Sequence, residues 1–283
     1  MRKIWKSSLW KLLLLPVLLI LLTVVSGTFS GCSKAGLSIQ LPVRSKSLGE
    51  CVVLIHGMGR TLHSMDEMQE QLVSAGYHTV SLGYPSTSVT IEEAARENFP
   101  EALARCQQFN PSAIHFVSHS LGGIVLRTIL KDSKPENMGR VVMLSPPNHG
   151  SEAADKLKDW WLYKMINGPA GQQLTTDENS VPNTLGPADY PVGIITGDRY
   201  FFFDYWLSQI IPGQDDGKVS VASSRLEGMQ DFLVVHETHP FIMDDEYVQE
   251  ETIYFLQNGK FKHQAAPPSP VPGTDWFSFP SNN

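Results

Sequence analysis

The chain has 283 residues, of which 42% are hydrophobic and 18% are charged, values that suit one compact globular domain. Its formal charge of −7 argues against a nucleic-acid partner, because binding to phosphates needs clustered lysine and arginine side chains. No such cluster stands outside the N-terminus, and the sequence shows no internal repeat or heptad run.

The N-terminal segment has the features of a targeting signal. Residues 1–11 carry four basic side chains and no acidic one, and the stretch from Leu12 to Val25 is almost wholly apolar. This stretch has the length of a signal peptide's hydrophobic region and is short for a membrane span. We therefore expect residues 1–31 to be a signal peptide.

The segment ends in FSGC, residues 29–32, which resembles the lipobox of bacterial lipoproteins, although Phe29 stands where leucine is usual. The resemblance implies lipidation of Cys32 and a membrane-anchored protein of the bacterial cell envelope that faces the periplasm or the exterior. A diacylated cysteine supplies two chains, whereas one chain alone binds membranes only marginally. An uncleaved anchor and plain secretion are the alternatives.

Residues 32–50 are polar and are expected to form a tether between this anchor and the folded domain. The two remaining cysteines are Cys51 and Cys106, which could pair in an oxidising compartment. We favour two buried free thiols, because two cysteines alone define no disulfide framework.

Short runs rich in apolar and β-branched residues predict six strands: Cys51–Ile55, His78–Leu82, Ala113–Val117, Arg140–Leu144, Pro191–Ile195 and Asp231–Val235. Continuous apolar runs of this length suit strands buried on both faces of a parallel sheet. Helical patterns separate most of them, over residues 62–73, 91–109, 120–130 and 244–256, and Pro100 is expected to kink or break the second. This alternation predicts a doubly wound α/β domain over residues 51–259 with right-handed crossovers.

Two aromatic-rich segments, residues 151–190 and 200–213, interrupt the alternation after the fourth and fifth strands. A lid over a pocket would sit at the carboxyl ends of these strands, so the segments are candidate cap insertions. Ordinary core packing is the alternative for each. Residues 260–283 are rich in proline, serine and asparagine and are expected to form a flexible tail.

The sequence VSHSLGG, residues 117–123, places Ser120 between a predicted strand and a predicted helix. It matches the nucleophile motif Gly-x-Ser-x-Gly only in part, because Ser118 replaces the first glycine. At such a strand–helix turn a nucleophilic serine has strained backbone angles, and the residues two before and two after must be small. Gly122 meets this requirement, and Ser118 adds only a hydroxymethyl group.

An attacking serine also needs N–H donors for the negative oxygen of the tetrahedral intermediate. Leu121, at the start of the helix, supplies one candidate donor. The loop LIHGMGR, residues 54–60, supplies the other at Met58, because its glycines let the backbone approach a ligand closely. A plain glycine turn is the alternative interpretation of this loop.

These motifs resemble the α/β-hydrolase superfamily, especially small bacterial lipases and esterases, over about residues 51–257. The resemblance implies a minimal α/β-hydrolase with six mainly parallel strands flanked by helices, because the stretch between Cys32 and Cys51 leaves no room for the first two strands of larger members. In this superfamily the order along the chain is nucleophile, acid, histidine.

This order directs the choice of base and acid. His239 lies in HETHPF after the sixth predicted strand, where the fold presents its base, and His236 is the fallback. The stretch DDGKVSVASSRLEG resembles the small-lipase segment that carries the acid and places it at Asp216, with Asp215 and Asp198 as alternatives.

The predicted function is hydrolysis of carboxylic esters with an apolar acyl group, through an acyl-enzyme on Ser120, with no cofactor or metal. An acyltransferase or a thioesterase would use the same triad. A non-catalytic lipoprotein with this fold is a further alternative. The last alternative is a metal hydrolase that binds its metal through His236 and His239. The sequence has no H-E-x-x-H pattern, which is typical of zinc hydrolases.

Overall fold

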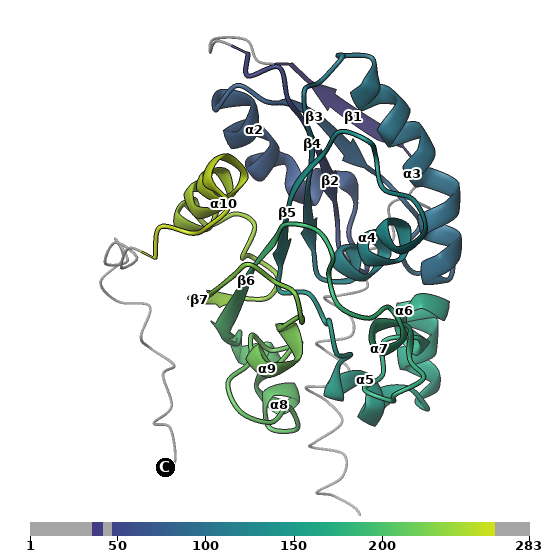
Figure 1. Ribbon diagram of the computed structural model, residues 1–283. Coiled ribbons are helices and arrows are strands. Elements are labelled where there is room, and N and C mark those ends of the chain that lie inside the picture. Colours follow the sequence, from purple (N-terminus) through teal and green to yellow (C-terminus); the bar gives the residue numbers. More distant parts are fainter. Residues whose placement is uncertain (1–35, 42–46, 264–283) are drawn as a thin grey trace, which may run out of the picture. The chain divides into compact units, whose positions relative to one another are not determined.

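The structure is a computed structural model that describes residues 36–41 and 47–263 (Figure 1). The expected signal peptide, Cys32 and residues 264–283 lie outside the described residues. Within the described part of the chain, no helix combines the length and the apolar character that a membrane crossing requires.

The domain is built on one seven-stranded sheet with the order β1-β3-β2-β4-β5-β6-β7. Its parallel strands correspond to the six predicted runs: β2 (Cys51–Ile55), β3 (His78–Leu82), β4 (Ile114–His119), β5 (Met138–Leu144), β6 (Val192–Arg199) and β7 (Asp231–Thr238). Strands β2 to β5 are almost completely buried on both faces, which is why their sequences show continuous apolar runs. The predicted α/β class is confirmed.

The seventh strand corrects two predictions. β1 (Leu37–Gln40) pairs antiparallel with β3 at the edge of the sheet, with Leu37 opposite Leu82. It lies inside the stretch 32–50 that we expected to be a tether, so the sheet has seven strands rather than six and the folded domain begins before Cys51. The four residues of β1 are mostly half-buried, and their strand conformation depends on pairing with the edge of β3.

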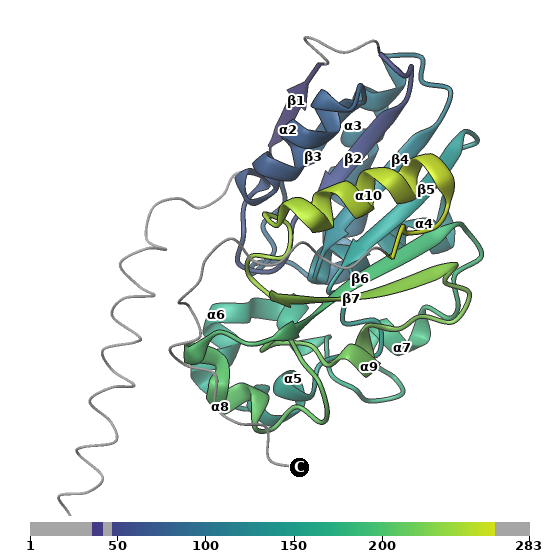
Figure 2. The same cartoon turned by 90° about the vertical axis from the view of Figure 1, so that its left-hand side faces the viewer.

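Helices cover both faces of the sheet (Figure 2). On one face, α3 (Ile91–Gln107) and α4 (Leu121–Asp132) pack over a core with Val53, Phe116 and Met143. The other face is covered by η1 (Leu62–Met65), α2 (Asp66–Ser74) and α10 (Glu246–Asn258). These helices pack over side chains that alternate along the strands with those of the first face, such as Leu54 and Val142.

Helix α3 does not end at Pro100. Pro100 and Arg96, whose carbonyl would accept the missing N–H, are both exposed, so water can satisfy that carbonyl. The helix is also stabilised by a capping box between Thr90 and Glu93 and by buried residues on both sides of the proline, including Phe99 and Ala102. The break that proline predicts is therefore absent.

Cys51 and Cys106 form a disulfide, which corrects the prediction of two free thiols. The bond joins the start of β2 to the end of α3, where the two Cα atoms are 5.8 Å apart. Because the cysteines are 55 positions apart in the chain, cross-linking them limits the unfolded ensemble and stabilises the fold by about 4 kcal/mol in the chain-entropy estimate. Only the packing of α3 beside β2 reveals this pairing.

The two aromatic-rich segments lie at the carboxyl ends of the parallel strands (Figure 1). The first contains three helices between β5 and β6, and the second contains two short ones between β6 and β7: α5 (Glu152–Leu157), α6 (Trp161–Gln172), α7 (Val181–Thr184), η2 (Phe202–Asp204) and α8 (Tyr205–Ser208). Leu207 and Ile211 of the second pack against Ala153 of the first, so the segments are in contact with each other.

The first residues of the predicted tail belong to the folded domain. Phe261 is buried and stacks near Phe255, with ring centroids 4.9 Å apart. Its backbone N–H donates to Asp231, and His263 hydrogen-bonds to the same carboxylate at 2.7 Å. The domain therefore extends to at least residue 263, beyond the predicted boundary at 259.

Candidate active site

Ser120 occupies a sharp turn between β4 and α4. Its φ of 52° and ψ of −125° lie in a region that residues with a side chain rarely adopt. The Ser120 N–H donates to the Leu144 carbonyl at 2.8 Å, and the Ser120 carbonyl accepts from Gly123 N–H at 2.9 Å. The strained turn that the motif predicts is therefore present and is held by backbone bonds on both sides.

Close packing around this turn explains which residues it accepts. A Cβ atom at Gly122 would lie 2.5 Å from the Ile55 carbonyl oxygen, so α4 approaches β2 too closely for any side chain there. Ser118 occupies the position where the motif has its first glycine and is fully buried. Gly123 faces it, since a Cβ there would lie 3.5 Å from Ser118 Oγ, and this leaves room for the extra hydroxymethyl group.

The structure brings Ser120, His239 and Asp216 into one line of hydrogen bonds. His239 Nε2 lies 2.9 Å from Ser120 Oγ, and His239 Nδ1 lies 2.7 Å from Asp216 Oδ2. The second carboxylate oxygen of Asp216 accepts from the backbone N–H groups of Lys218 and Val219 at 3.1 and 2.9 Å. Asp216 is completely buried, so the carboxylate is held in one orientation toward the imidazole.

The tertiary fold accounts for this convergence. Ser120 and His239 are 119 residues apart, and His239 and Asp216 are 23 residues apart. Ser120 follows β4 and His239 follows β7, so both stand where parallel strands end. The His239 N–H also donates to the Asp216 carbonyl at 3.0 Å, which ties the two loops together.

The alternative base and acids have other partners. His236 has an exposed side chain that hydrogen-bonds to Asp198 at 2.9 Å. Asp215 accepts from the Ser208 hydroxyl and from Gly217 N–H, both at 2.8 Å, and burial raises the pKa of its carboxyl group. His236, Asp198 and Asp215 therefore take no part in the line of hydrogen bonds at Ser120. No cluster of three or more potential metal ligands occurs in the described ranges.

His119 is a member of this site that sequence reasoning missed. Its Nε2 lies 3.0 Å from the His239 carbonyl oxygen. Burial and the neighbouring His239 ring hold the pKa of His119 well below its ordinary value, so the ring is neutral and donates this Nε2–H. His119 thus supports the loop that carries His239, a role that depends on where β7 ends in space.

The loop after β2 lies beside Ser120. A Cβ atom at Gly57 would lie 3.0 Å from Ser120 Cβ, so glycine is required for this approach. Neither Met58 N–H nor Leu121 N–H donates to a protein acceptor in the part of the chain that the structure describes. Both amides are therefore available to a substrate oxygen.

The side chain of His56 holds this loop in place through hydrogen bonds to Gly57 and Tyr84. Its Nδ1–H donates to the Gly57 carbonyl at 2.8 Å, and its Nε2 accepts from Tyr84 N–H at 3.3 Å. The Tyr84 ring stacks on the imidazole, with centroids 4.4 Å apart, and the Tyr84 hydroxyl donates to the His56 carbonyl at 2.8 Å. These bonds need the neutral form of the ring, because Nε2 must stay an acceptor.

Acid is expected to destabilise the domain through His56. Burial lowers the pKa of His56 from 6.5 to about 4 in the folded protein, whereas the unfolded chain takes up a proton below about pH 6.5. Because the unfolded state binds more protons between these values, the free energy of unfolding falls by roughly 3 kcal/mol as the pH drops through this window. Urea unfolding at about pH 7.5 and about pH 4.5 measures the loss.

The variant His56→Gln removes this titration and should show a smaller loss of unfolding free energy between the two pH values. His63→Gln changes an exposed histidine and serves as the matched control, with the wild-type pH dependence retained. An identical pH dependence in all three proteins would contradict the assignment.

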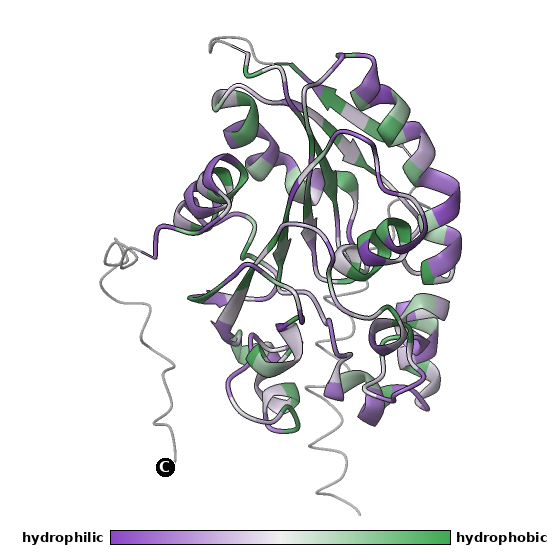
Figure 3. Ribbon diagram, viewed as in Figure 1, coloured by the Kyte–Doolittle hydropathy of each residue, from purple (hydrophilic) through white to green (hydrophobic). Residues whose placement is uncertain are grey.

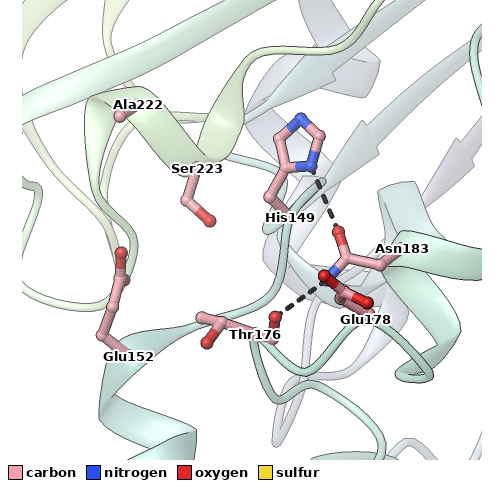
Figure 4. A pocket seen from close by; sticks show the side chains of 7 residues that line it. All are labelled: His149, Glu152, Thr176, Glu178, Asn183, Ala222 and Ser223. Atoms are coloured by element: carbon pink, nitrogen blue, oxygen red, sulfur yellow. Dashed lines mark hydrogen bonds between the residues drawn. The ribbon is translucent and has the colours of Figure 1, made fainter.

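A separate open pocket of about 550 Å³ lies between the loop after β5 and α9 (Val221–Ser224) (Figure 4). His149 points into it beside Asn183, with 3.2 Å between His149 Nδ1 and the Asn183 side-chain oxygen. Glu152, Thr176 and Ser223 contribute further polar lining, and neither Ser120 nor His239 is part of it.

A mainly parallel sheet with a serine at the β4–α4 turn, followed by a buried carboxylate and a histidine, defines an α/β-hydrolase. The palmitoyl protein thioesterase family matches residues 51–234, more than half of the sequence, and the chain belongs to this family. It is thus a hydrolase of esters or thioesters, as the motifs predicted.

Curated relatives agree with this family, and solved structures agree with the fold. The chain is 23% identical to the lysosomal thioesterase PPT2 of Rattus norvegicus over 86% of each chain, and 23% identical to the Homo sapiens protein over 78% of this chain and 76% of the other. The Bacillus licheniformis lipase BlEst2 in propeptide form has a TM-score of 0.59 at 20% identity, covering 74% of this chain and 50% of the lipase. A monoglyceride lipase of Saccharomyces cerevisiae has a TM-score of 0.57 at 12% identity, covering 81% and 93%.

Proposed function

We propose that this protein releases long apolar acyl groups from thioesters and esters, with Ser120 as nucleophile, His239 as general base and Asp216 as the orienting acid. The observation that carries the proposal is the line of hydrogen bonds from Ser120 Oγ through His239 to Asp216, with distances of 2.9 and 2.7 Å. A serine hydroxyl is unreactive at neutral pH unless a base takes its proton, and this arrangement supplies one.

In the acylation step His239 Nε2 accepts the hydroxyl proton while Ser120 Oγ attacks the carbonyl carbon. The oxygen of the tetrahedral intermediate becomes negative, and the Met58 and Leu121 N–H groups donate to it. His239 then gives its proton to the departing thiol or alcohol. Asp216 accepts the Nδ1–H throughout and stabilises the imidazolium without taking the proton.

Deacylation repeats the sequence with water. His239 removes a proton from the water molecule, which attacks the acyl-enzyme and regenerates Ser120 with release of the fatty acid. An acyltransferase would differ only in the acceptor that replaces water, so product analysis separates the two activities.

Family membership favours a thioester as the substrate, and two of the relatives described above are named thioesterases. A thiol has an ordinary pKa of about 8.5, far below that of an alcohol, so it departs with less help from a proton donor. The same triad therefore cleaves both bond types.

A substrate panel tests the proposal. Purified full-length protein is offered palmitoyl and butyryl thioesters together with the matching p-nitrophenyl esters, and fatty acid release is measured for each. We expect hydrolysis of both palmitoyl substrates, faster than of the butyryl ones. A fluorophosphonate probe should label the wild-type protein, and absence of both labelling and turnover would favour the non-catalytic lipoprotein.

We also propose that residues 1–31 are a signal peptide and that Cys32 carries the lipid anchor, on the side of the membrane that faces the periplasm or the exterior. The FSGC sequence supports lipidation, and the Cys51–Cys106 disulfide supports an oxidising compartment.

A Cys32→Ala variant tests this anchor. The wild-type protein should be found in the membrane fraction with a lipid mass on its N-terminal peptide, whereas the variant should carry no such mass. Wild-type protein that retains residues 1–31 would instead indicate an uncleaved anchor.

A further inference from the structure

Large apolar side chains are exposed at one edge of the domain. Thirteen large hydrophobic residues are exposed among the described residues, and nine of them fall in residues 160–166, 201–206 and at Phe241. Scattered exposed residues need no explanation, but a concentration of this kind marks an interaction surface. We call six of them the aromatic edge: Trp160, Trp161, Met165, Ile166, Trp206 and Phe241.

The aromatic edge lies at the end of the sheet that carries the active site. Its members come from the segments that follow β5, β6 and β7, at the carboxyl ends of the parallel strands (Figure 3). Phe241 stands two residues after His239, and its ring lies 6.2 Å from that of Phe201 in the segment after β6. Trp161 is 73% exposed and Trp206 is 50% exposed, so half or more of the surface of each residue is in water.

The direction of β1 places the start of the folded domain at this same edge. β1 is antiparallel to β3, so its first residue, Leu37, lies opposite Leu82, the last residue of β3. The preceding Gly36 accepts a hydrogen bond from Gly83 N–H at 2.7 Å. The N-terminal segment therefore joins the domain where the parallel strands end, next to the loops that bear the site.

Cys32 is separated from Gly36 by four residue steps. Four fully extended residues span at most about 14 Å. A lipid at Cys32 keeps this edge of the domain within that reach of the bilayer. A tether of that length attached at the opposite edge would have kept the site at the far side of the domain.

We propose that the aromatic edge docks on the lipid bilayer surface and turns the carboxyl ends of the parallel strands, where Ser120 and His239 stand, toward it. Tryptophan and other amphipathic aromatic side chains are favoured at the membrane–water interface, where their apolar rings leave bulk water. The net charge is −7 for the whole chain and becomes more negative once the four basic residues of the signal peptide are removed. This charge does not favour attraction to anionic lipids, so apolar contact drives the docking and zwitterionic lipid suffices. The proposal rests on the acyl hydrolase function and on the Cys32 anchor, and implies that lipid-embedded acyl chains reach Ser120 directly from the bilayer.

Full-length protein reconstituted in phosphatidylcholine vesicles tests the docking. Lipids with brominated acyl chains quench tryptophan fluorescence only when the rings enter the bilayer. The mature chain holds four tryptophans, of which only Trp276 lies outside the aromatic edge, so a Trp160→Ser/Trp161→Ser/Trp206→Ser variant isolates the contribution of this edge. We expect most of the wild-type quenching to disappear in the variant and the wild-type quenching to be unchanged by high salt.

Activity supplies the second readout. The triple variant should hydrolyse a palmitoyl thioester embedded in vesicles about tenfold more slowly than the wild type, while its turnover of a water-soluble butyryl ester changes by less than about twofold. Leu48→Ser removes an exposed apolar side chain just before β2, at the opposite end of the sheet, and should leave both activities and the quenching unchanged.

The outcomes separate docking from catalysis. Wild-type protein that is quenched by brominated lipid but hydrolyses nothing retains the docking and refutes the hydrolase function. Wild-type protein that hydrolyses soluble esters but is not quenched refutes the docking. Tryptophans that are already shielded from water without lipid, in a dimer or beneath residues 264–283, would assign the edge to those occupants and refute the membrane proposal as well.

Discussion

Replacing Ser120 with alanine is expected to lower turnover of palmitoyl thioester by roughly 10⁴–10⁶-fold while the domain stays folded. The variant loses the hydroxyl oxygen that we propose attacks the carbonyl, whereas the backbone bonds of the turn to Leu144 and Gly123 are unaffected. Steady-state kinetics measure the loss, and circular dichroism with thermal unfolding checks the fold. Labelling by a fluorophosphonate probe should disappear.

Ser118→Ala is the matched control for this experiment. Ser118 lies two residues earlier, in β4, is fully buried, and its hydroxyl has no hydrogen-bond partner in the described part of the chain. The control should keep turnover within about threefold of wild type and retain probe labelling, because it removes no bond and no reacting atom. Ser120→Ala protein with near-normal turnover would remove Ser120 from the mechanism.

The variant Asp216→Asn is expected to lower kcat by about 10⁴-fold with little change in structure. The amide can still accept the Lys218 and Val219 N–H bonds through its oxygen. Its NH2 group then points at His239 Nδ1 and makes that nitrogen an acceptor, which leaves the proton on Nε2. A ring in this tautomer cannot take the proton of Ser120.

Asp198→Asn tests the same substitution at the carboxylate that pairs with His236. Because the Asp198–His236 pair lies outside the line of hydrogen bonds at Ser120, the turnover of the Asp198→Asn variant should stay near the wild-type value. A large loss at position 198 together with a small loss at position 216 would reverse the assignment of the acid.

Local sequence determined much of the fold and one member of the candidate site. The parallel strands follow from mainly apolar runs, because strands covered on both faces, such as β2, need apolar side chains at most positions. The position of Ser120 follows from a strand, a turn with small residues and a helix that are contiguous in sequence. His239 and Asp216 were predicted from the order of acid and histidine in the superfamily that the motifs resemble. The structure brings both residues to Ser120. Their catalytic roles stay a prediction that the variants above test.

Only the tertiary structure decided the features that depend on contacts between distant segments. β1 has four residues without a strand signal of their own and is ordered by the edge of β3. The Cys51–Cys106 bond, the contact of His119 with the His239 loop and the packing of Phe261 likewise join segments that local patterns treat separately. Sequence periodicity reports which side of an element is buried, and it carries no information on which distant residue covers that side.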